Sequence, residues 1–159
     1  MEWAEKIFSI VSQWGSGAYW LVFGFSFLES LAFLGTLFPG ATLVVFAGFL
    51  SSQDILKPGS LIFFVFAGAA LGDAFSYWLG LKNKRDFKKG KIFFGSDYLE
   101  KGCCFLKKYG PESIFLARFM GPARSIIPFV AGAASLRPRV FLSWNLASVA
   151  LWAISHVLL

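Results

Sequence analysis

Long apolar stretches dominate this chain of 159 residues, and they constrain its fold more than any other feature. Hydrophobic residues make up 57% of the chain and charged residues only 15%, whereas soluble domains carry about 25% charged residues. A soluble fold of this size cannot bury so much apolar surface, and a chain this apolar does not stay disordered. The sequence therefore predicts a membrane protein, and its length predicts a single domain.

Two stretches are long enough to span a membrane as plain helices. A helix needs about 20 apolar residues to cross the hydrocarbon core, and residues 60–81 and 139–159 meet that requirement. Residues 1–17 carry apolar side chains at helical spacing but lack the basic start of a cleavable signal. We expect them to form an amphipathic helix that lies at the membrane surface.

Two other apolar stretches are interrupted by helix-breaking residues. Residues 18–52 contain Pro39-Gly40, and the apolar arm that follows covers only about half of the hydrocarbon core. Residues 111–137 contain Gly121-Pro122 near their middle, with Arg118 before this pair and Arg124 after it. We interpret both stretches as re-entrant helical hairpins with these pairs at their tips. Such backbone is tolerated at membrane depth only when it is buried in protein or lines a wet cavity.

The hairpins resemble one unit used twice. The string FPGATLVVFAG at 38–48 is similar to GPARSIIPFVAG at 121–132, and one predicted span follows each hairpin. The hairpins are expected to enter from opposite sides, as in the inverted repeats of secondary transporters. The predicted fold is an all-α polytopic membrane protein built from two re-entrant hairpins, each followed by a transmembrane helix.

A hydrophilic segment at 82–110 sets the predicted orientation. It holds nine lysines and arginines against three acidic residues. The positive-inside rule therefore places this segment in the cytoplasm, and we expect a multi-pass protein of the cell (inner) membrane. We expect anionic lipid rather than nucleic acid to be the partner of these charges. Cys103 and Cys104 are adjacent and cannot link distant segments, and the chain has one histidine, so neither a disulfide framework nor a metal site is predicted.

Four charged residues fall well inside the apolar runs at 18–38, 61–81 and 114–136: Glu29, Asp73, Arg118 and Arg124. Each costs about 2.5–3.5 kcal/mol at the centre of a membrane, so they should face a shared interior and pair or contact water. Arginine presents a planar, always-charged fork that suits phosphate. Carboxylates in such a site can bind protons. For Glu29 and Asp73, two interpretations therefore remain: a structural role in pairing with the arginines, or a role in transport.

Several motifs combine into a recognisable pattern. They are Glu29 before Pro39-Gly40, Gly72-Asp73 with Tyr77 and Gly80, Tyr109-Gly110-Pro111, FLARFMGPARSIIPFVAG at 115–132, and Asn145 and Trp152 near the end. Together they resemble the DedA family, also called the VTT or SNARE-associated domain proteins. The resemblance implies two opposed re-entrant hairpins and the handling of lipid phosphates. Bacterial members are associated with returning undecaprenyl phosphate across the membrane, and eukaryotic relatives with lipid scrambling.

The resemblance also implies roles for individual residues. The functional acid of the first hairpin corresponds to Glu29, and the paired arginines correspond to Arg118 and Arg124, six residues apart. Three departures stand out. Many members carry an acid directly after the first Pro-Gly, where this chain has Ala41, so Glu29 and Asp73 are left as candidates for proton coupling. The second tip reads Gly-Pro instead of Pro-Gly. Relatives usually continue with another helix beyond the position of Leu159. Its absence from this sequence would be explained by truncation, by a helix from another copy of the chain or by a fused domain.

The leading interpretation is a flippase-like transporter of a lipid phosphate, most simply undecaprenyl phosphate. Arg118 and Arg124 would bind the headgroup, and Glu29 and Asp73 would pair with them and couple transport to protons. A proton-coupled ion or drug antiporter and an uncoupled lipid scramblase are the alternatives. No enzymatic activity, catalytic residue, metal or cofactor is expected, because Ser16 and His156 lack the context of an intramembrane protease. A homo-oligomer is left open.

Overall fold

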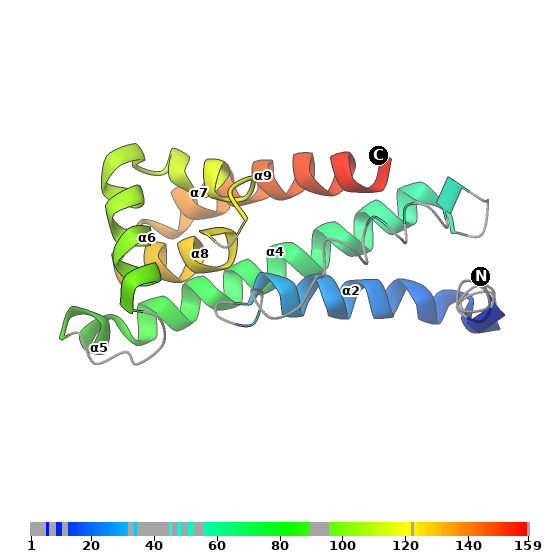
Figure 1. Cartoon of the computed structure of the whole chain (residues 1–159), viewed down its shortest axis with the longest axis horizontal. Coiled ribbons are helices and arrows are strands. Elements are labelled where there is room, and N and C mark those ends of the chain that lie inside the picture. The colour runs from blue at the N-terminus through cyan, green and yellow to red at the C-terminus, as the bar shows by residue number, and fades with distance from the viewer. Residues whose placement is uncertain are drawn as a thin grey trace.

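The described residues are all-helical wherever their structure is regular. A computed structural model of the chain describes residues 6, 9–10, 13–31, 34, 45, 48, 51–52, 56–89, 96–121 and 123–158. Its helices there are α2 (Ser16–Ser30), α4 (Pro58–Lys82), α5 (Lys84–Lys88), α6 (Ser96–Tyr109), α7 (Glu112–Ala117), α8 (Ala123–Ala133) and α9 (Pro138–Leu158) (Figure 1). The predicted all-α class is confirmed for these residues. Most of the expected helix at 1–17 and the tip residues Pro39, Gly40 and Pro122 lie outside them.

Within the described residues, two helices are long and apolar enough by length and composition to cross a membrane, α4 with 25 residues and α9 with 21. At about 1.5 Å per residue they extend about 37 and 31 Å, enough for a hydrocarbon core of about 30 Å. They correspond to the two spans predicted from sequence. Each begins slightly earlier than predicted, at Pro58 and Pro138, because proline is well suited to the first position of a helix, where no backbone N–H donor is needed.

Helix α2 runs in the same direction as α4 and lies close against it. The carbonyl of Phe23 faces Gly68 and that of Phe27 faces Gly72, so positions advance together along the two helices. A Cβ added at either glycine would lie 2.5–2.6 Å from these carbonyl oxygens, so only glycine permits this approach. Because the two helices are parallel, the chain between them must return to the end at which α2 begins.

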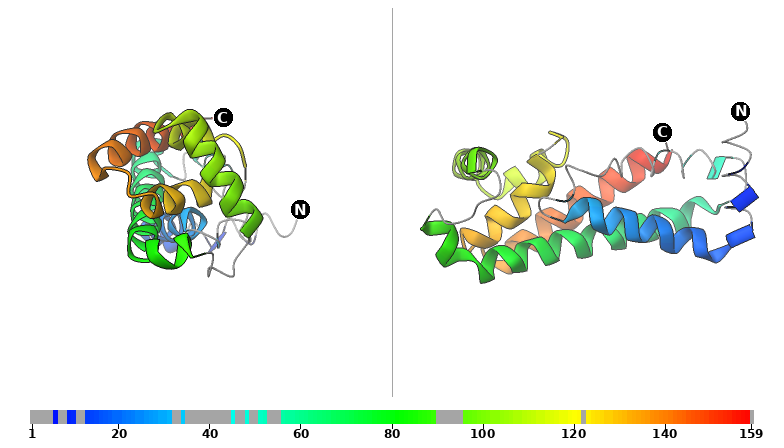
Figure 2. Two further views of the ribbon diagram at one scale, coloured as in Figure 1. Left: turned by 90° about the vertical axis from the view of Figure 1, so that its left-hand side faces the viewer. Right: turned by 60° about the horizontal axis from the view of Figure 1, so that its bottom comes forward.

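The second half of the chain repeats this arrangement of directions. Figures 1 and 2 show α7 running the same way as α9. Helix α8, which lies between them in the sequence, runs in the opposite direction. Helix α9 is antiparallel to α4, because Phe141 near its start stacks on Tyr77 near the end of α4, with ring centroids 4.3 Å apart. Near its other end, α9 contributes Val157 to an apolar cluster that also holds Leu61 and Val65 of α4.

Two elements differ from the expectation based on sequence. Helix α2 ends at Ser30 because Leu31 adopts an extended conformation, so the helix stops well before the Pro39 break that was expected to end it. The basic segment at 82–110 was predicted only as a cytoplasmic segment without assigned helices, and it contains α5 and the amphipathic helix α6. Leu99 of α6 shares an apolar cluster with Val130 of α8, which anchors this segment to the rest of the fold.

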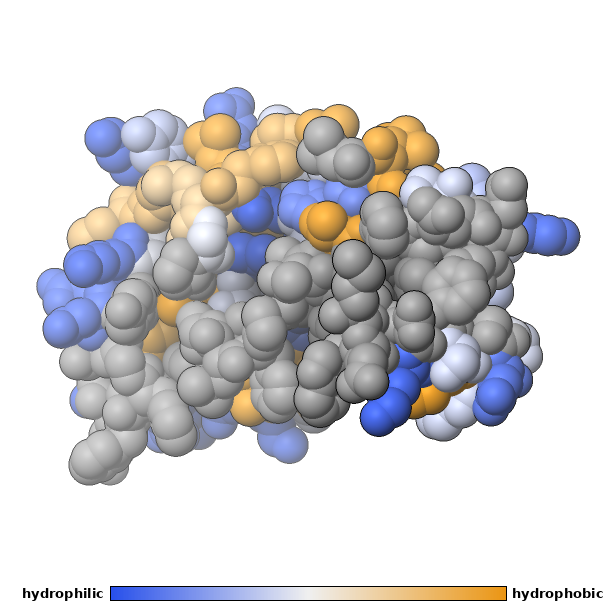
Figure 3. Space-filling model, turned by 45° about the vertical axis from the view of Figure 1, so that its right-hand side comes forward, coloured by the Kyte–Doolittle hydropathy of each residue, from blue (hydrophilic) through white to orange (hydrophobic). Residues whose placement is uncertain are grey.

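Large apolar side chains cover much of the surface of the two long helices. Figure 3 shows apolar side chains at the surface along the upper part of one face. Exposed patches of this kind mark contact with lipid or with a partner. On α4 they are Phe63, Leu71, Phe75 and Trp78, and on α9 they are Leu142, Leu146, Leu151, Ile154 and Leu158.

Candidate functional site

Glu29 enters the interior because one face of α2 is small and polar. Ser26 and Ser30, three residues before and one after Glu29, are fully buried against α4. The Ser26 hydroxyl donates to the carbonyl of Val65 at 2.9 Å, and the hydroxyl of Ser76 on α4 donates to the carbonyl of Ser30 at 3.2 Å. This face of α2 therefore turns inward, and it carries the Glu29 carboxylate with it.

Arg118 ends α7 and forms an ion pair with Asp73 of α4. Its Nη2 donates to Asp73 Oδ2 and also, at 3.0 Å, to Asn145 Oδ1 of α9. Its Nε donates to the hydroxyl of Ser148 on α9 at 3.1 Å. Asp73 is completely buried and Arg118 is 5% exposed. One buried guanidinium group thus joins α7, α4 and α9.

Arg124 lies in the first turn of α8 and forms an ion pair with Glu29. Its Nη1 donates to Glu29 Oε1 at 2.6 Å. Its guanidinium carbon also lies 4.1 Å from the centre of the Trp152 ring on α9, a cation–π distance. Neither Arg124 nor Glu29 is more than 8% exposed. The pair therefore connects α2 with α8, across 95 residues of sequence.

The two ion pairs belong to one electrostatic cluster. Arg124 interacts electrostatically with Arg118 and Asp73 as well as with Glu29. The pairing expected from the cost of intramembrane charge is present, with one carboxylate for each guanidinium. The transport roles given to these four residues remain predictions.

Each arginine keeps donors that the described residues do not use. Arg118 Nη1, Arg124 Nε and Arg124 Nη2 are buried and have no hydrogen-bond partner within the described ranges. A buried charged donor without a partner is costly, so such groups mark a place where an acceptor is expected to bind. The cluster therefore contains N–H groups, on two separate guanidinium planes, that the described residues leave without an acceptor.

The turn between α7 and α8 separates the two arginines. Gly121 has φ of +60°, a left-handed conformation that glycine adopts without strain, and its carbonyl accepts the N–H of Arg124 at 3.2 Å. Inside α8, Pro128 has no N–H to donate to the carbonyl of Arg124. Of the four predicted tip residues, only Gly121 is described; it lies in the turn between α7 and α8, and its place at the tip of a re-entrant hairpin stays a prediction.

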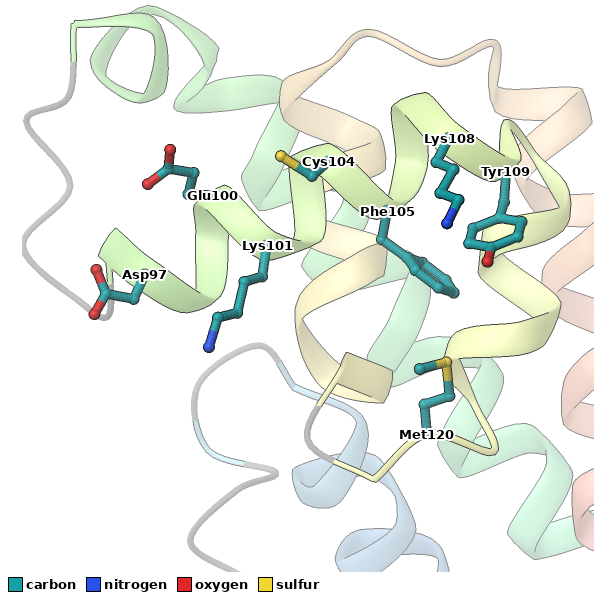
Figure 4. A pocket seen from close by; sticks show the side chains of 8 residues that line it. All are labelled: Asp97, Glu100, Lys101, Cys104, Phe105, Lys108, Tyr109 and Met120. Carbon is teal, nitrogen blue, oxygen red and sulfur yellow. The ribbon is translucent and has the colours of Figure 1, made fainter.

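A separate groove of about 660 Å³ lies on the exposed side of α6. Figure 4 shows its lining, with Met120 of the α7–α8 turn facing α6. Two acids and two lysines line it, so its charges balance and give it no preference for an anion. Its residues are Asp97, Glu100, Lys101, Cys104, Phe105, Lys108, Tyr109 and Met120. We assign no role to this groove.

Sequence reasoning missed the contribution of α9 to the site. Asn145 and Trp152 were noted only as part of the family pattern, and Ser148 was not noted. Both Asn145 and Ser148 are fully buried. The available signal was their spacing, because positions 145, 148 and 152 lie on one face of a helix. Neutral polar side chains in an apolar span often bond to neighbouring helices, but they are less conspicuous than charges.

Comparison with known proteins finds one matching family and several relatives at about 30% identity. The VTT domain family matches residues 38–159. The chain is 32% identical to Protein DedA of Escherichia coli K12 over 91% of this chain and 68% of that protein. It is 30% identical to the inner membrane protein YghB of Salmonella typhimurium over 86% of this chain and 64% of that protein. It is 32% identical to the inner membrane protein YabI of Escherichia coli K12 over 80% of this chain and 50% of that protein.

No solved structure matches the chain. The family match covers more than half of the chain, and it includes Asp73 together with both arginines. The alignments with the DedA, YghB and YabI proteins cover 91%, 86% and 80% of the chain. This chain is therefore a membrane protein that belongs to the DedA family of VTT-domain proteins.

Proposed function

We propose that this protein moves a lipid phosphate across the inner membrane, with undecaprenyl phosphate as the first candidate. The observation that carries the proposal is the buried pair of arginines, each bound to one carboxylate and each keeping unused N–H donors. Guanidinium donors in a fixed plane suit the oxygens of a phosphate group.

Charge balance supports a role for protons. Two arginines and two carboxylates make the empty site neutral. An anionic headgroup that binds there adds negative charge in a poorly solvated place, which is costly unless a carboxylate takes up a proton or moves away. Glu29 and Asp73 are the groups that would do so, and phosphate binding would then be linked to proton uptake.

The helix directions support the re-entrant repeat that we propose. Because α2 and α4 are parallel, the chain between them returns to its starting side, and α8 returns between the parallel α7 and α9 in the same way. Helix α8 has 11 residues and extends about 16 Å, about half of the hydrocarbon core. In this proposal both hairpins bring polar groups to the middle of the membrane while the lipid tail stays in the bilayer.

The basic segment at 82–110 is proposed to lie in the cytoplasm, and its two cysteines provide a test. Cys104 is exposed on α6, whereas Cys103 is partly buried, and burial raises the pKa of the Cys103 thiol. A raised pKa leaves less reactive thiolate at any pH below it. We expect a membrane-impermeant maleimide to label Cys104 faster than Cys103 in inverted vesicles and to label neither in intact spheroplasts. Variants Cys103→Ser and Cys104→Ser show which cysteine carries the label. Labelling in intact spheroplasts would show that the segment lies outside the cytoplasm and would contradict the proposed orientation.

Transport itself is tested in proteoliposomes that contain a radiolabelled polyprenyl phosphate. We expect movement of the lipid between leaflets to fall at least tenfold in Arg124→Ala, because the site loses one guanidinium group. Arg124→Lys should recover only part of the rate, since lysine keeps the charge but loses the planar fork. Arg139→Ala, an exposed arginine on α9, is the matched control. Unchanged transport in Arg124→Ala would contradict the proposal.

The same assay separates the alternatives. An antiporter would move protons against another ion in liposomes without any lipid phosphate. An uncoupled scramblase would move lipids regardless of headgroup and of the proton gradient. The unused donors of Arg118 and Arg124 favour the phosphate carrier over both.

A further inference from the structure

Helix α9 holds both arginines by uncharged groups. Asn145 and Ser148 accept hydrogen bonds from Arg118, and Trp152 lies beneath the guanidinium of Arg124. These three side chains occur at 145, 148 and 152, on one face of the helix, and we name this set the α9 ridge. All three are at least 98% buried. Both guanidinium groups therefore rest on one rigid element.

The type of contact matters for an anion site. A cation–π contact uses the flat face of the guanidinium and leaves its in-plane N–H groups available. Trp152 therefore holds Arg124 while Nε and Nη2 keep no partner among the described residues. On Arg118 the ridge takes Nε and shares Nη2 with Asp73, which leaves Nη1.

The ridge also differs from the carboxylates in what happens when an anion arrives. Glu29 and Asp73 carry negative charge and compete with a phosphate for the arginines. Asn145, Ser148 and Trp152 are neutral, so an incoming anion does not repel them. An arginine held only by its carboxylate would lose its orientation when that carboxylate is protonated or displaced.

We propose that the α9 ridge is a permanent platform that orients Arg118 and Arg124 for the phosphate, with Trp152 as the positioning residue for Arg124. This inference rests on the proposed function. It adds that the carboxylates are exchangeable partners of the arginines, while the ridge remains in contact throughout binding and release.

Substitutions at Trp152 test the platform through affinity. Trp152→Leu keeps an apolar side chain but removes the aromatic face, and we expect the Kd for a polyprenyl phosphate in detergent micelles to rise about tenfold. Trp152→Phe keeps a weaker aromatic face and should recover most of the affinity. In an Arg124→Gln background, where no cation lies over the ring, Trp152→Leu should change the Kd less than about twofold.

The chain offers matched controls for both ends of the ridge. Trp144 lies on α9 but packs with the cluster around Tyr77, so Trp144→Leu measures the loss of a tryptophan away from the arginines. Ser143 and Ser148 each donate to the carbonyl three residues earlier, but only Ser148 accepts from Arg118. We expect Ser148→Ala to weaken binding severalfold and Ser143→Ala to leave it unchanged, with melting temperatures recorded for all variants.

The outcomes separate this inference from the proposed function. If the unaltered protein binds the lipid phosphate but Trp152→Leu and Trp144→Leu have equal Kd values, the platform is refuted and the proposed function stands. The same conclusion follows if Trp152→Leu weakens binding equally with and without Arg124, because the tryptophan would then act through general packing. If the unaltered protein binds no lipid phosphate, the proposed function itself fails.

Discussion

Replacing Arg118 by methionine is expected to destabilise the protein by about 3–5 kcal/mol, because it leaves the Asp73 carboxylate buried without a counter-ion. Asp73 is completely buried, so water cannot take the place of the guanidinium. The substitution also removes the donors that Asn145 and Ser148 accept. Asp73→Asn should likewise destabilise the protein, because it leaves the Arg118 charge uncompensated.

The double variant separates stability from function. Exchanging a buried ion pair for neutral groups is often neutral, so Asp73→Asn combined with Arg118→Met should recover most of the stability lost in Arg118→Met. The coupling between the two positions is expected to be about 2–3 kcal/mol, measured by unfolding each variant in detergent. The restored protein should still fail to move lipid phosphate, since it lacks one of the two guanidinium groups.

A purely structural ion pair predicts a different result. In that case the double variant would fold and also transport. Arg139→Met, at an exposed position of α9, should change stability by no more than about 0.5 kcal/mol and serves as the control. Additive effects of the two single substitutions would show that Arg118 and Asp73 do not depend on one another, which would contradict the buried pair.

The four charged residues could be predicted because the membrane makes charge expensive. Glu29, Asp73, Arg118 and Arg124 stand out against apolar neighbours, and their pairing follows from the cost of leaving them in lipid. Sequence could not determine which acid meets which arginine. The pairing is set by how α2, α4, α7 and α8 pack together: Arg124 of α8 meets Glu29 of α2, and Arg118 at the end of α7 meets Asp73 of α4.

Other features carried weaker signals. The bounds of the long apolar helices α4 and α9 were predictable to within two residues from apolar length alone. The end of α2 at Ser30 was not, because no proline or glycine marks it and the apolar run continues. The α9 ridge was missed for a related reason: neutral groups such as Ser148 cost little in an apolar helix, so their presence does not by itself demand a partner.

Close packing between α4 and α8 holds α8, which carries Arg124, against α4, which carries Asp73. Gly80 of α4 lies against the backbone of Phe129, and Gly132 of α8 lies against the backbone of Tyr77. A Cβ at either glycine would overlap a carbonyl oxygen, and backbone cannot move aside as a flexible side chain can. The contact is reciprocal, so each helix relies on a glycine of the other.

We therefore expect Gly132→Ala and Gly80→Ala each to destabilise the protein by about 3 kcal/mol, at the upper end of overpacking effects. Because α8 carries Arg124, separation of the helices should also displace its guanidinium from Glu29 and Trp152. Displacement of a binding group by about 1 Å is enough to reduce transport by tenfold or more.

Gly24→Ala is the control, since a Cβ there meets no atom within 4 Å and alanine is favoured in a helix by about 1 kcal/mol. Melting temperature and lipid phosphate transport should both fall in the first two variants, while Gly24→Ala should leave transport unchanged and stability equal or higher. If Gly132→Ala behaved like Gly24→Ala, α4 and α8 would not be in the close contact on which the position of Arg124 depends.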